Sequence, residues 1–345
     1  MKKTCLSFLS LLSFVLLFNA CSTDVDLYAD YKDITIVYGL LDSDKDTNYV
    51  KINRAFLGPG NALEIALIED SCNYPYKLDA KIIEYKASIG NTNYQKTREI
   101  QLDTITIHNK NQEGFFYAPD QVVYYTTEKI YSNTDKFKYR YELLIDRGDT
   151  IISAVTDMVG GYGFNILQPG SMDFANETGS RIKWQPCPNA AVYEIVLKFR
   201  FTEVGLLQDS TELCMSWSLG THSETSLDMD QGNYVLSHQS SVFYYELSKF
   251  LGKYCDTTNI NIDRVVLDSP QHRPVCVSIA AGGEELYNFI SVNGPSSSIV
   301  QSIPEYTNVK GGYGVFSSRT MKERWIKFAS IQDLKKYENW RFRQG

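Results

Sequence analysis

The sequence predicts a mainly β protein made of two β-rich domains. Its 345 residues include 24 tyrosines and 17 phenylalanines, which suit the pleated, half-buried surface of a sheet. Short runs with a period of two, separated by turns, recur through the first half and are typical of a β-sandwich. A chain of this length exceeds what one hydrophobic core usually organises, so two domains are expected.

The chain begins with the features of a secretory signal. Lys2 and Lys3 precede an apolar run over residues 6–18, and Ala20 stands before Cys21. This run is shorter than the roughly 20 apolar residues that a spanning helix needs. We therefore expect residues 1–20 to be a signal peptide.

Cys21 has two interpretations, an incidental cysteine after a plain signal peptide or a site of lipidation. Residues 18–21 resemble the lipobox of bacterial lipoproteins, with Phe18 where leucine is usual. The resemblance implies that Cys21 is diacylated, with palmitate as a lipid label, and becomes the first residue of the mature chain. Residues 21–32 would then form a lipidated tether.

Residues 33–158 are predicted to form the first domain, an immunoglobulin-like or fibronectin-like β-sandwich. The segment 42–46 lacks the later residues of a calcium loop and is predicted to be a hairpin turn. The clearest strand places Phe137, Tyr139 and Tyr141 on one face, which a sheet core requires more often than a sugar site does. A helical excursion is expected over 62–70, and strands over 34–38, 48–52, 81–85, 99–107, 121–125, 136–145 and 150–155.

Three glycines, Gly160, Gly161 and Gly163, mark the predicted boundary of a second domain over residues 159–345. Ser240 is the predicted cap of a helix whose apolar face holds Phe243, Leu247, Phe250, Leu251 and Tyr254. Ser330 with Asp333 predicts a last helix over 331–337. Strands are expected over 262–267 and 274–280, and a further helix over 284–292, so the domain is β-rich with two or three helices packed on it.

Residues 181–186 and 190–197 resemble the B and C strands of a fibronectin type III domain. A strand with Trp184 is followed by a short turn and by a strand that opens on Tyr193. The resemblance covers about 25 residues and implies that both aromatic side chains belong to the core rather than to a ligand site.

The charge and the cysteines limit the function classes. The formal net charge is −7 and no block of lysine and arginine occurs, which argues against nucleic acid or an anionic membrane surface as a partner. Five cysteines follow Cys21 without metal spacing, and small buried thiols are a simpler interpretation than disulfides. They are Cys72, Cys187, Cys214, Cys255 and Cys276.

The sequence offers no recognisable catalytic motif. The four histidines His108, His222, His238 and His272 have no zinc-type spacing, and neither a GxSxG elbow nor a P-loop is present. We therefore expect no cofactor and no metal. Two carboxylates that converge in space could still serve a hydrolase, which sequence does not exclude.

Three stretches, residues 36–41, 49–58 and 306–319, resemble uncharacterised lipoproteins of Bacteroidetes with a domain of unknown function. The resemblance implies an outer-membrane protein, on the cell surface or the periplasmic face, often encoded beside TonB-dependent receptors. It brings no catalytic residues. Asp24 and Asp26 loosely fit the surface-export signal of these bacteria, and their O-glycosylation pattern makes Thr104 and Thr150 candidate sites.

Gly311, Gly312 and Gly314 lie in the last of these stretches. Glycine permits positive φ or close approach of another element, so they are interpreted as a structural turn, with a ligand-touching loop as the alternative.

The leading functional hypothesis is a non-catalytic, lipid-anchored envelope protein that binds a ligand or partner for a TonB-dependent outer-membrane β-barrel. The alternatives are an adhesive or pilus-associated surface component and, third, a carboxylate hydrolase.

Overall fold

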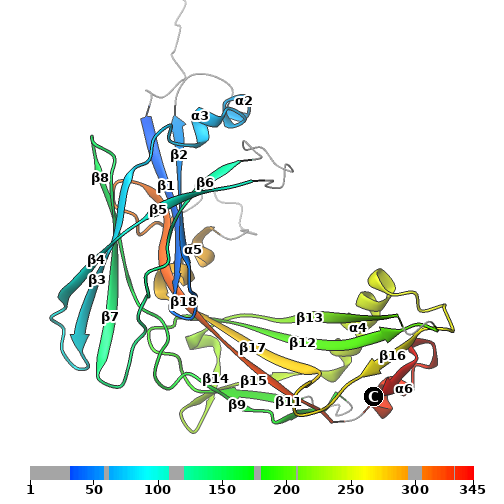
Figure 1. Cartoon of the computed structure of the whole chain (residues 1–345). Coiled ribbons are helices and arrows are strands. Elements are labelled where there is room, and N and C mark those ends of the chain that lie inside the picture. The colour runs from blue at the N-terminus through cyan, green and yellow to red at the C-terminus, as the bar shows by residue number, and fades with distance from the viewer. Residues whose placement is uncertain are drawn as a thin grey trace, which may run out of the picture.

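The protein is mainly β, as predicted. The computed structural model describes residues 32–57, 62–108, 120–174, 180–206, 209–293, 305–329 and 331–345. Figure 1 shows two β-sandwiches arranged as the arms of an L, with strand β18 (Tyr313–Phe328) running from one arm into the other. We call these arms the first and the second sandwich.

The first sandwich has two facing sheets with a buried core between them. One has the order β18, β1 (Lys32–Asp42), β2 (Asn48–Leu57), β6 (Gln121–Thr126) and β5 (Asp103–Ile107). The other has the order β4 (Gln95–Gln101), β3 (Asp79–Ser88), β7 (Phe137–Asp146) and β8 (Ile151–Asp157). Helices α2 (Ala62–Ala66) and α3 (Glu69–Cys72) follow β2. The core includes Val37, Val50, Ile82, Tyr141 and Phe316.

The second sandwich also has two sheets. One has the order β13 (Ser210–Ser223), β12 (Val192–Val204), β17 (Val275–Gly282) and β18. The end of β12 also pairs with β16 (Asp263–Val266), which pairs with β19 (Phe342–Gln344). The other sheet has the order β14 (Asp228–Asp230), β15 (Asn233–His238), β11 (Ser180–Trp184) and β9 (Ile166–Gln168). The short β10 (Ser171–Met172) pairs with β18.

Helices complete the second half of the chain. The longest is α4 (Ser240–Tyr254), which buries Phe243, Leu247 and Leu251 in the second core. Helix α5 (Glu284–Asn293) follows β17 and contacts β18. The remaining turns are η1 (Glu224–Ser226), α6 (Gln332–Lys335) and η2 (Glu338–Trp340).

Strand β18 belongs to both sandwiches. Its first part pairs in parallel with β1, from Ile36 opposite Tyr313 to Asp42 opposite Arg319. Its second part pairs antiparallel with β17, from Gly282 opposite Arg319 to Val275 opposite Ile326. The limits 33–158 and 159–345 stay a prediction. The start of β18 completes the first sandwich from the far end of the sequence.

Several local predictions are confirmed. Residues 42–47 form the turn between β1 and β2, where Asn48 Oδ1 accepts a hydrogen bond from the Asp42 backbone at 2.7 Å. In β7, Tyr139, Tyr141 and Leu143 are buried on one face. Trp184 and Tyr193 are both fully buried, with ring centroids 5.7 Å apart, and β11 and β12 lie in opposing sheets as B and C strands do.

Three local predictions need correction. Residues 99–107 are two strands, because the chain leaves β4 and enters β5 in the opposing sheet at the buried Leu102. The N-cap of α4 is Gln239 rather than Ser240, and Tyr254 is 56% exposed instead of lying on the buried face. The last helix ends early as α6 and continues as η2, while Ser330 lies outside the described residues.

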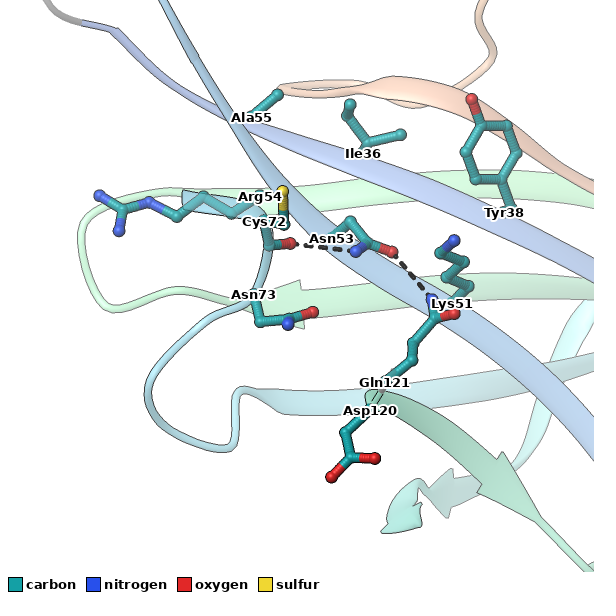
Figure 2. A pocket seen from close by; sticks show the side chains of 10 residues that line it. All are labelled: Ile36, Tyr38, Lys51, Asn53, Arg54, Ala55, Cys72, Asn73, Asp120 and Gln121. Atoms are coloured by element: carbon teal, nitrogen blue, oxygen red, sulfur yellow. Dashed lines mark hydrogen bonds between the residues drawn. The ribbon is translucent and has the colours of Figure 1, made fainter. Parts of the chain in front are cut away.

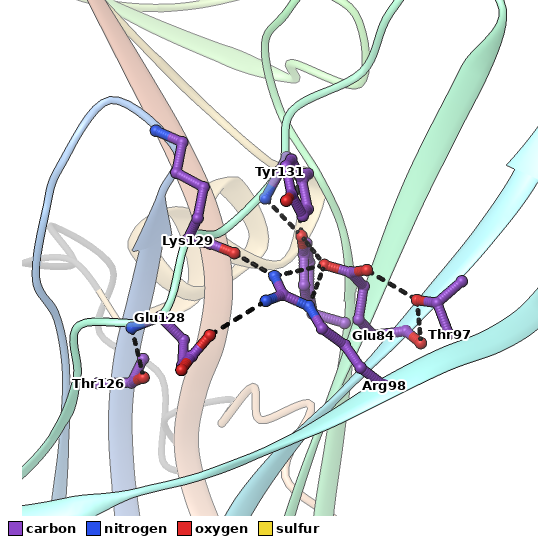
Figure 3. Close-up of polar contacts among 8 residues, drawn as sticks. Glu84, Thr97, Arg98, Thr126, Glu128, Lys129 and Tyr131 are labelled. Carbon is purple, nitrogen blue, oxygen red and sulfur yellow. Dashed lines mark hydrogen bonds and ion pairs between the residues drawn. The ribbon is translucent and has the colours of Figure 1, made fainter.

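A buried ion pair fixes the connection between β6 and β7 (Figure 3). Glu84 of β3 is 3% exposed and accepts hydrogen bonds from Arg98 Nε at 3.1 Å and Nη2 at 2.8 Å. The oxygen that binds Arg98 also accepts a hydrogen bond from Tyr141 Oη at 3.0 Å, and the other oxygen accepts from Thr97 Oγ1 at 2.7 Å. Arg98 also donates to the Lys129 carbonyl, so the pair holds the connecting segment against the sheet.

Candidate functional site

The outer face of the β1–β2 hairpin is unusually apolar for a sheet face turned away from the core. Side chains alternate along a strand, so the inward Val37 and Leu41 fill the core while Ile36, Tyr38 and Leu40 point outward. An antiparallel sheet with one solvated face normally alternates apolar and polar residues. In β1 both faces are apolar, which marks the outer one as a candidate contact surface.

The first hollow on this face, which we call the amide pocket, has a volume of about 190 Å³ (Figure 2). Asn53 donates from Nδ2 to the Cys72 carbonyl at 3.0 Å, and Gln121 lies 3.5 Å from Asn53 Oδ1. Neighbouring Arg54 pairs with Asp33 at 3.1 Å. The lining also includes Ile36, Tyr38, Lys51, Asn73 and Asp120.

The second hollow, which we call the helix pocket, lies between the β1–β2 hairpin and α5 and has a volume of about 480 Å³. That volume falls within the range typical of ligand sites. Its polar end holds Asp42, Lys45, Asn48 and Arg319, with Arg319 Nε 3.8 Å from Asp42 Oδ2. Its apolar wall is formed by Tyr38, Leu40, Tyr49, Leu286, Phe289 and Ile290.

Tyr38 lines both pockets, and we call the two pockets together the Tyr38 groove. Its ring makes an edge-to-face contact with Phe289 at a centroid distance of 6.0 Å, yet Tyr38 remains 44% exposed. Tyr49, at the far end of the helix pocket, is 50% exposed and packs beside Tyr125. The groove follows β2 from Ala55 to Tyr49, which corresponds to roughly 20 Å of extended strand.

The position of α5 is fixed by a buried carboxylate in its first turn. Glu285 accepts hydrogen bonds from Ser317 Oγ at 2.9 Å and Thr156 Oγ1 at 3.1 Å. Burial raises the pKa of Glu285 above its ordinary value, and the nearby Asp157 raises it further. The wall of the helix pocket is therefore tied to both β18 and β8.

The candidate glycines join β18 to the hairpin rather than lining the groove. Gly314 has a φ of +107°, and a Cβ at that position would lie 2.0 Å from the Val37 carbonyl oxygen. A Cβ at Gly312 would lie 2.6 Å from the Thr35 carbonyl oxygen, and Gly311 packs against the Ile151 carbonyl. Only glycine permits this approach of β18 to β1, and Phe316 then enters the first core.

The remaining predicted sites are spread over the molecule. Cys21 lies outside the described residues. Thr150 is exposed in the turn between β7 and β8, whereas Thr104 is partly buried in β5. The five later cysteines are all free; burial raises the pKa of Cys187 and of Cys276 to about 12, so both thiols stay protonated at neutral pH.

Within the part of the chain that the structure describes, no group of three or more histidine, cysteine or acidic side chains is placed to hold a metal. No helix among the same residues is both long and apolar enough to span a membrane. Among the described residues of the lining, Asp120 is the carboxylate of the amide pocket and Asp42 that of the helix pocket.

Sequence reasoning missed the groove. The signal was present in residues 34–41, where Ile34, Ile36, Tyr38 and Leu40 alternate with Val37 and Leu41, so that both faces of one strand are apolar. Comparison with models of protein families and with curated proteins finds no match to this chain.

Proposed function

We propose that the protein is a non-catalytic, lipid-anchored envelope protein that binds a ligand or partner in the Tyr38 groove. The observation that carries the proposal is that exposed aromatic rings and amide side chains line two pockets that share Tyr38. Aromatic residues supply contact area at low cost in side-chain entropy, and amides fix orientation.

The proposed setting is the bacterial outer membrane, with Cys21 as the lipidated residue and residues 21–32 as the tether. The apolar run 6–18 and the lipobox-like segment before Cys21 support this setting. The resemblance of three stretches to Bacteroidetes lipoproteins supports a TonB-dependent β-barrel transporter as the partner. Thr150 is the better placed of the two glycosylation candidates, because its side chain is exposed.

A hydrolase is the less favoured alternative. Glycoside hydrolysis requires two carboxylates that face each other within roughly 5–10 Å across a scissile bond. Each pocket of the groove presents one carboxylate among its described lining residues, and Asp42 is already close to Arg319. The lining therefore supports binding better than acid–base chemistry.

The test is purification of the full-length lipoprotein from its native membrane in mild detergent. An outer-membrane β-barrel protein should be recovered with the wild-type lipoprotein, at a constant ratio of the two proteins. Tyr38→Ala, which alters the groove, should reduce this recovery. Tyr245→Ala is its matched control, because Tyr245 of α4 is 62% exposed and lies outside the groove. Recovery of the lipoprotein alone, under conditions that keep known envelope complexes intact, would contradict the proposed partner.

A further inference from the structure

The sheets of this protein have several free edges, and most of them are protected against pairing with another chain. Edge strands in natural proteins are usually short, charged, bulged or covered. Strand β4 carries Lys96, Arg98 and Glu99, and β5 is five residues long with Asp103 paired to Lys77. Strand β8 is bridged by Lys310, while β9, β14 and β19 have three residues each.

Strand β13 lacks these protections. It is 14 residues long, and among the described residues it pairs only with β12. Figure 1 shows it as the outer strand of the second sandwich. Its pairing with β12 is regular from Ser210 to Ser218, and the register shifts only beyond that point. Glu212 is the single charged residue of the regular stretch.

The side chains of this stretch leave the edge accessible. Met215 and Trp217 point into the second core and are buried. On the other face Ser210, Glu212, Cys214, Ser216 and Ser218 are all exposed and small, apart from Glu212. An edge strand presents N–H and C=O groups on the side away from its partner, and no basic side chain of the regular stretch is available to block them.

We propose that two copies of this chain pair antiparallel through β13 and join their sheets into one. A strand that pairs antiparallel with its own copy satisfies the outward donors and acceptors of both strands about a two-fold axis. The regular stretch from Ser210 to Ser218 pairs with its own copy over its full length when its middle residue, Cys214, lies on the two-fold axis. This inference is independent of the proposed function, because the groove lies in the other sandwich.

The charge pattern fits a second copy. With Cys214 on the axis, Glu212 of one chain lies opposite Ser216 of the other, so the two Glu212 carboxylates do not face each other. Glu212 is also 3.3 Å from His272 Nε2 of its own chain. Residues directly opposite on antiparallel strands have Cα atoms about 4.5–5.5 Å apart, so the two Cys214 thiols lie within reach of one short bismaleimide.

The experiment measures the mass of the full-length protein in detergent by sedimentation, together with cross-linking by a short bismaleimide. The wild type should sediment as two chains and give a cross-linked dimer that Cys214→Ser abolishes and Cys255→Ser does not. Ser216→Glu should sediment as one chain, because the substitution places a glutamate of each chain opposite Glu212 of the other chain. Ser216→Lys should remain a dimer, because lysine then faces Glu212.

The two Ser216 variants alter the same exposed position, and a cooperative thermal unfolding transition in each shows that both are folded. A single chain for the wild type at high micromolar concentration overturns the proposal. A dimer that Ser216→Glu leaves intact also overturns it. A series of cross-linked oligomers larger than a dimer overturns it as well, because such a series indicates that β13 pairs with a different strand of the neighbouring chain. None of these results bears on the Tyr38 groove.

Discussion

Tyr38 of β1 and Phe289 of α5 meet edge to face across the helix pocket, with their ring centroids 6.0 Å apart. The two residues are far apart in the sequence, and β18 brings them together by pairing with β1 while it contacts α5. Aromatic pairs of this geometry contribute about 0.5–1.5 kcal/mol beyond the area they bury. The contact fixes one wall of the groove before any ligand arrives.

Anchoring is tested at Cys21. Cys21→Ala removes the thiol that would carry the lipid, so the protein should leave the membrane fraction and lose palmitate labelling. The measurement is fractionation of cells grown with a labelled fatty acid. Cys214→Ser, which alters an exposed thiol in β13, is the control and should stay with the membranes. A Cys21→Ala protein that still pellets and still labels would contradict lipidation at Cys21.

The Glu84–Arg98 pair predicts a non-additive pattern of stability. Arg98→Met leaves the Glu84 carboxylate buried without its cation, which typically costs about 3–5 kcal/mol of unfolding free energy. Adding Glu84→Gln to Arg98→Met should recover part of that loss, because the buried charge is then absent. Urea unfolding of the two single variants and the double variant provides the measurement. A double variant less stable than Arg98→Met would refute this account of the pair.

His238 predicts a dependence of stability on pH. The ring is 6% exposed, neither ring nitrogen has a hydrogen-bond partner among the described residues, and burial lowers its pKa from 6.5 to about 4. The unfolded chain therefore binds a proton that the folded chain does not, and stability should fall as the pH drops from 6.5 towards 4. The loss is at most about 3.4 kcal/mol, from about 1.36 kcal/mol for each unit of the pKa difference.

His238→Leu removes this titration while keeping an apolar side chain among Phe174 and Trp217. Urea unfolding at pH 7 and at pH 4.5 compares the two proteins. The difference between the two pH values should be smaller for the variant by the contribution of His238. Equal losses in the wild type and the variant would show that His238 is not the group responsible.

Substitution of Gly314 should strongly lower the stability of the fold, although the residue has no chemical role. Gly314→Ala would bring a Cβ within 2.0 Å of the Val37 carbonyl oxygen, so β18 could not pair with β1 in its present register. Gly90→Ala is the matched control, because Gly90 also has positive φ, of +82°, but no described atom beyond its chain neighbours lies within 4 Å of the added Cβ. The control should cost about 1 kcal/mol and the Gly314 variant several times more, as measured by thermal unfolding.

Local structure could be predicted from the sequence wherever a short-range pattern determines it. The alternation around Tyr139 and Tyr141 identified β7, and the spacing of Phe243, Leu247 and Leu251 identified the buried face of α4. Trp184 and Tyr193 were assigned to the core, where both lie. The first two predictions follow from the period of a strand or helix against one core, and the third follows from the resemblance to a fibronectin type III domain.

What could not be predicted depends on pairing between distant segments. No local period shows that Tyr313 pairs beside Ile36, or that the chain changes sheets at Leu102. The helix pocket needs α5 placed against β1 by β18, so its lining has no counterpart in any single stretch. The doubled apolar pattern of β1 was the available clue, since it leaves Tyr38 outside the core.

The most direct test of the account replaces Tyr38 with a photoactivatable phenylalanine analogue in cells that carry the full-length lipoprotein. The matched control places the same analogue at Tyr245, and Tyr38→Ala is assayed in parallel for co-purification. Illumination should link the Tyr38 probe to one envelope β-barrel, and Tyr38→Ala should reduce recovery of that protein at least tenfold, equivalent to about 1.4 kcal/mol. Equal cross-linking from both positions, or undiminished recovery with Tyr38→Ala, would contradict a binding role for the groove.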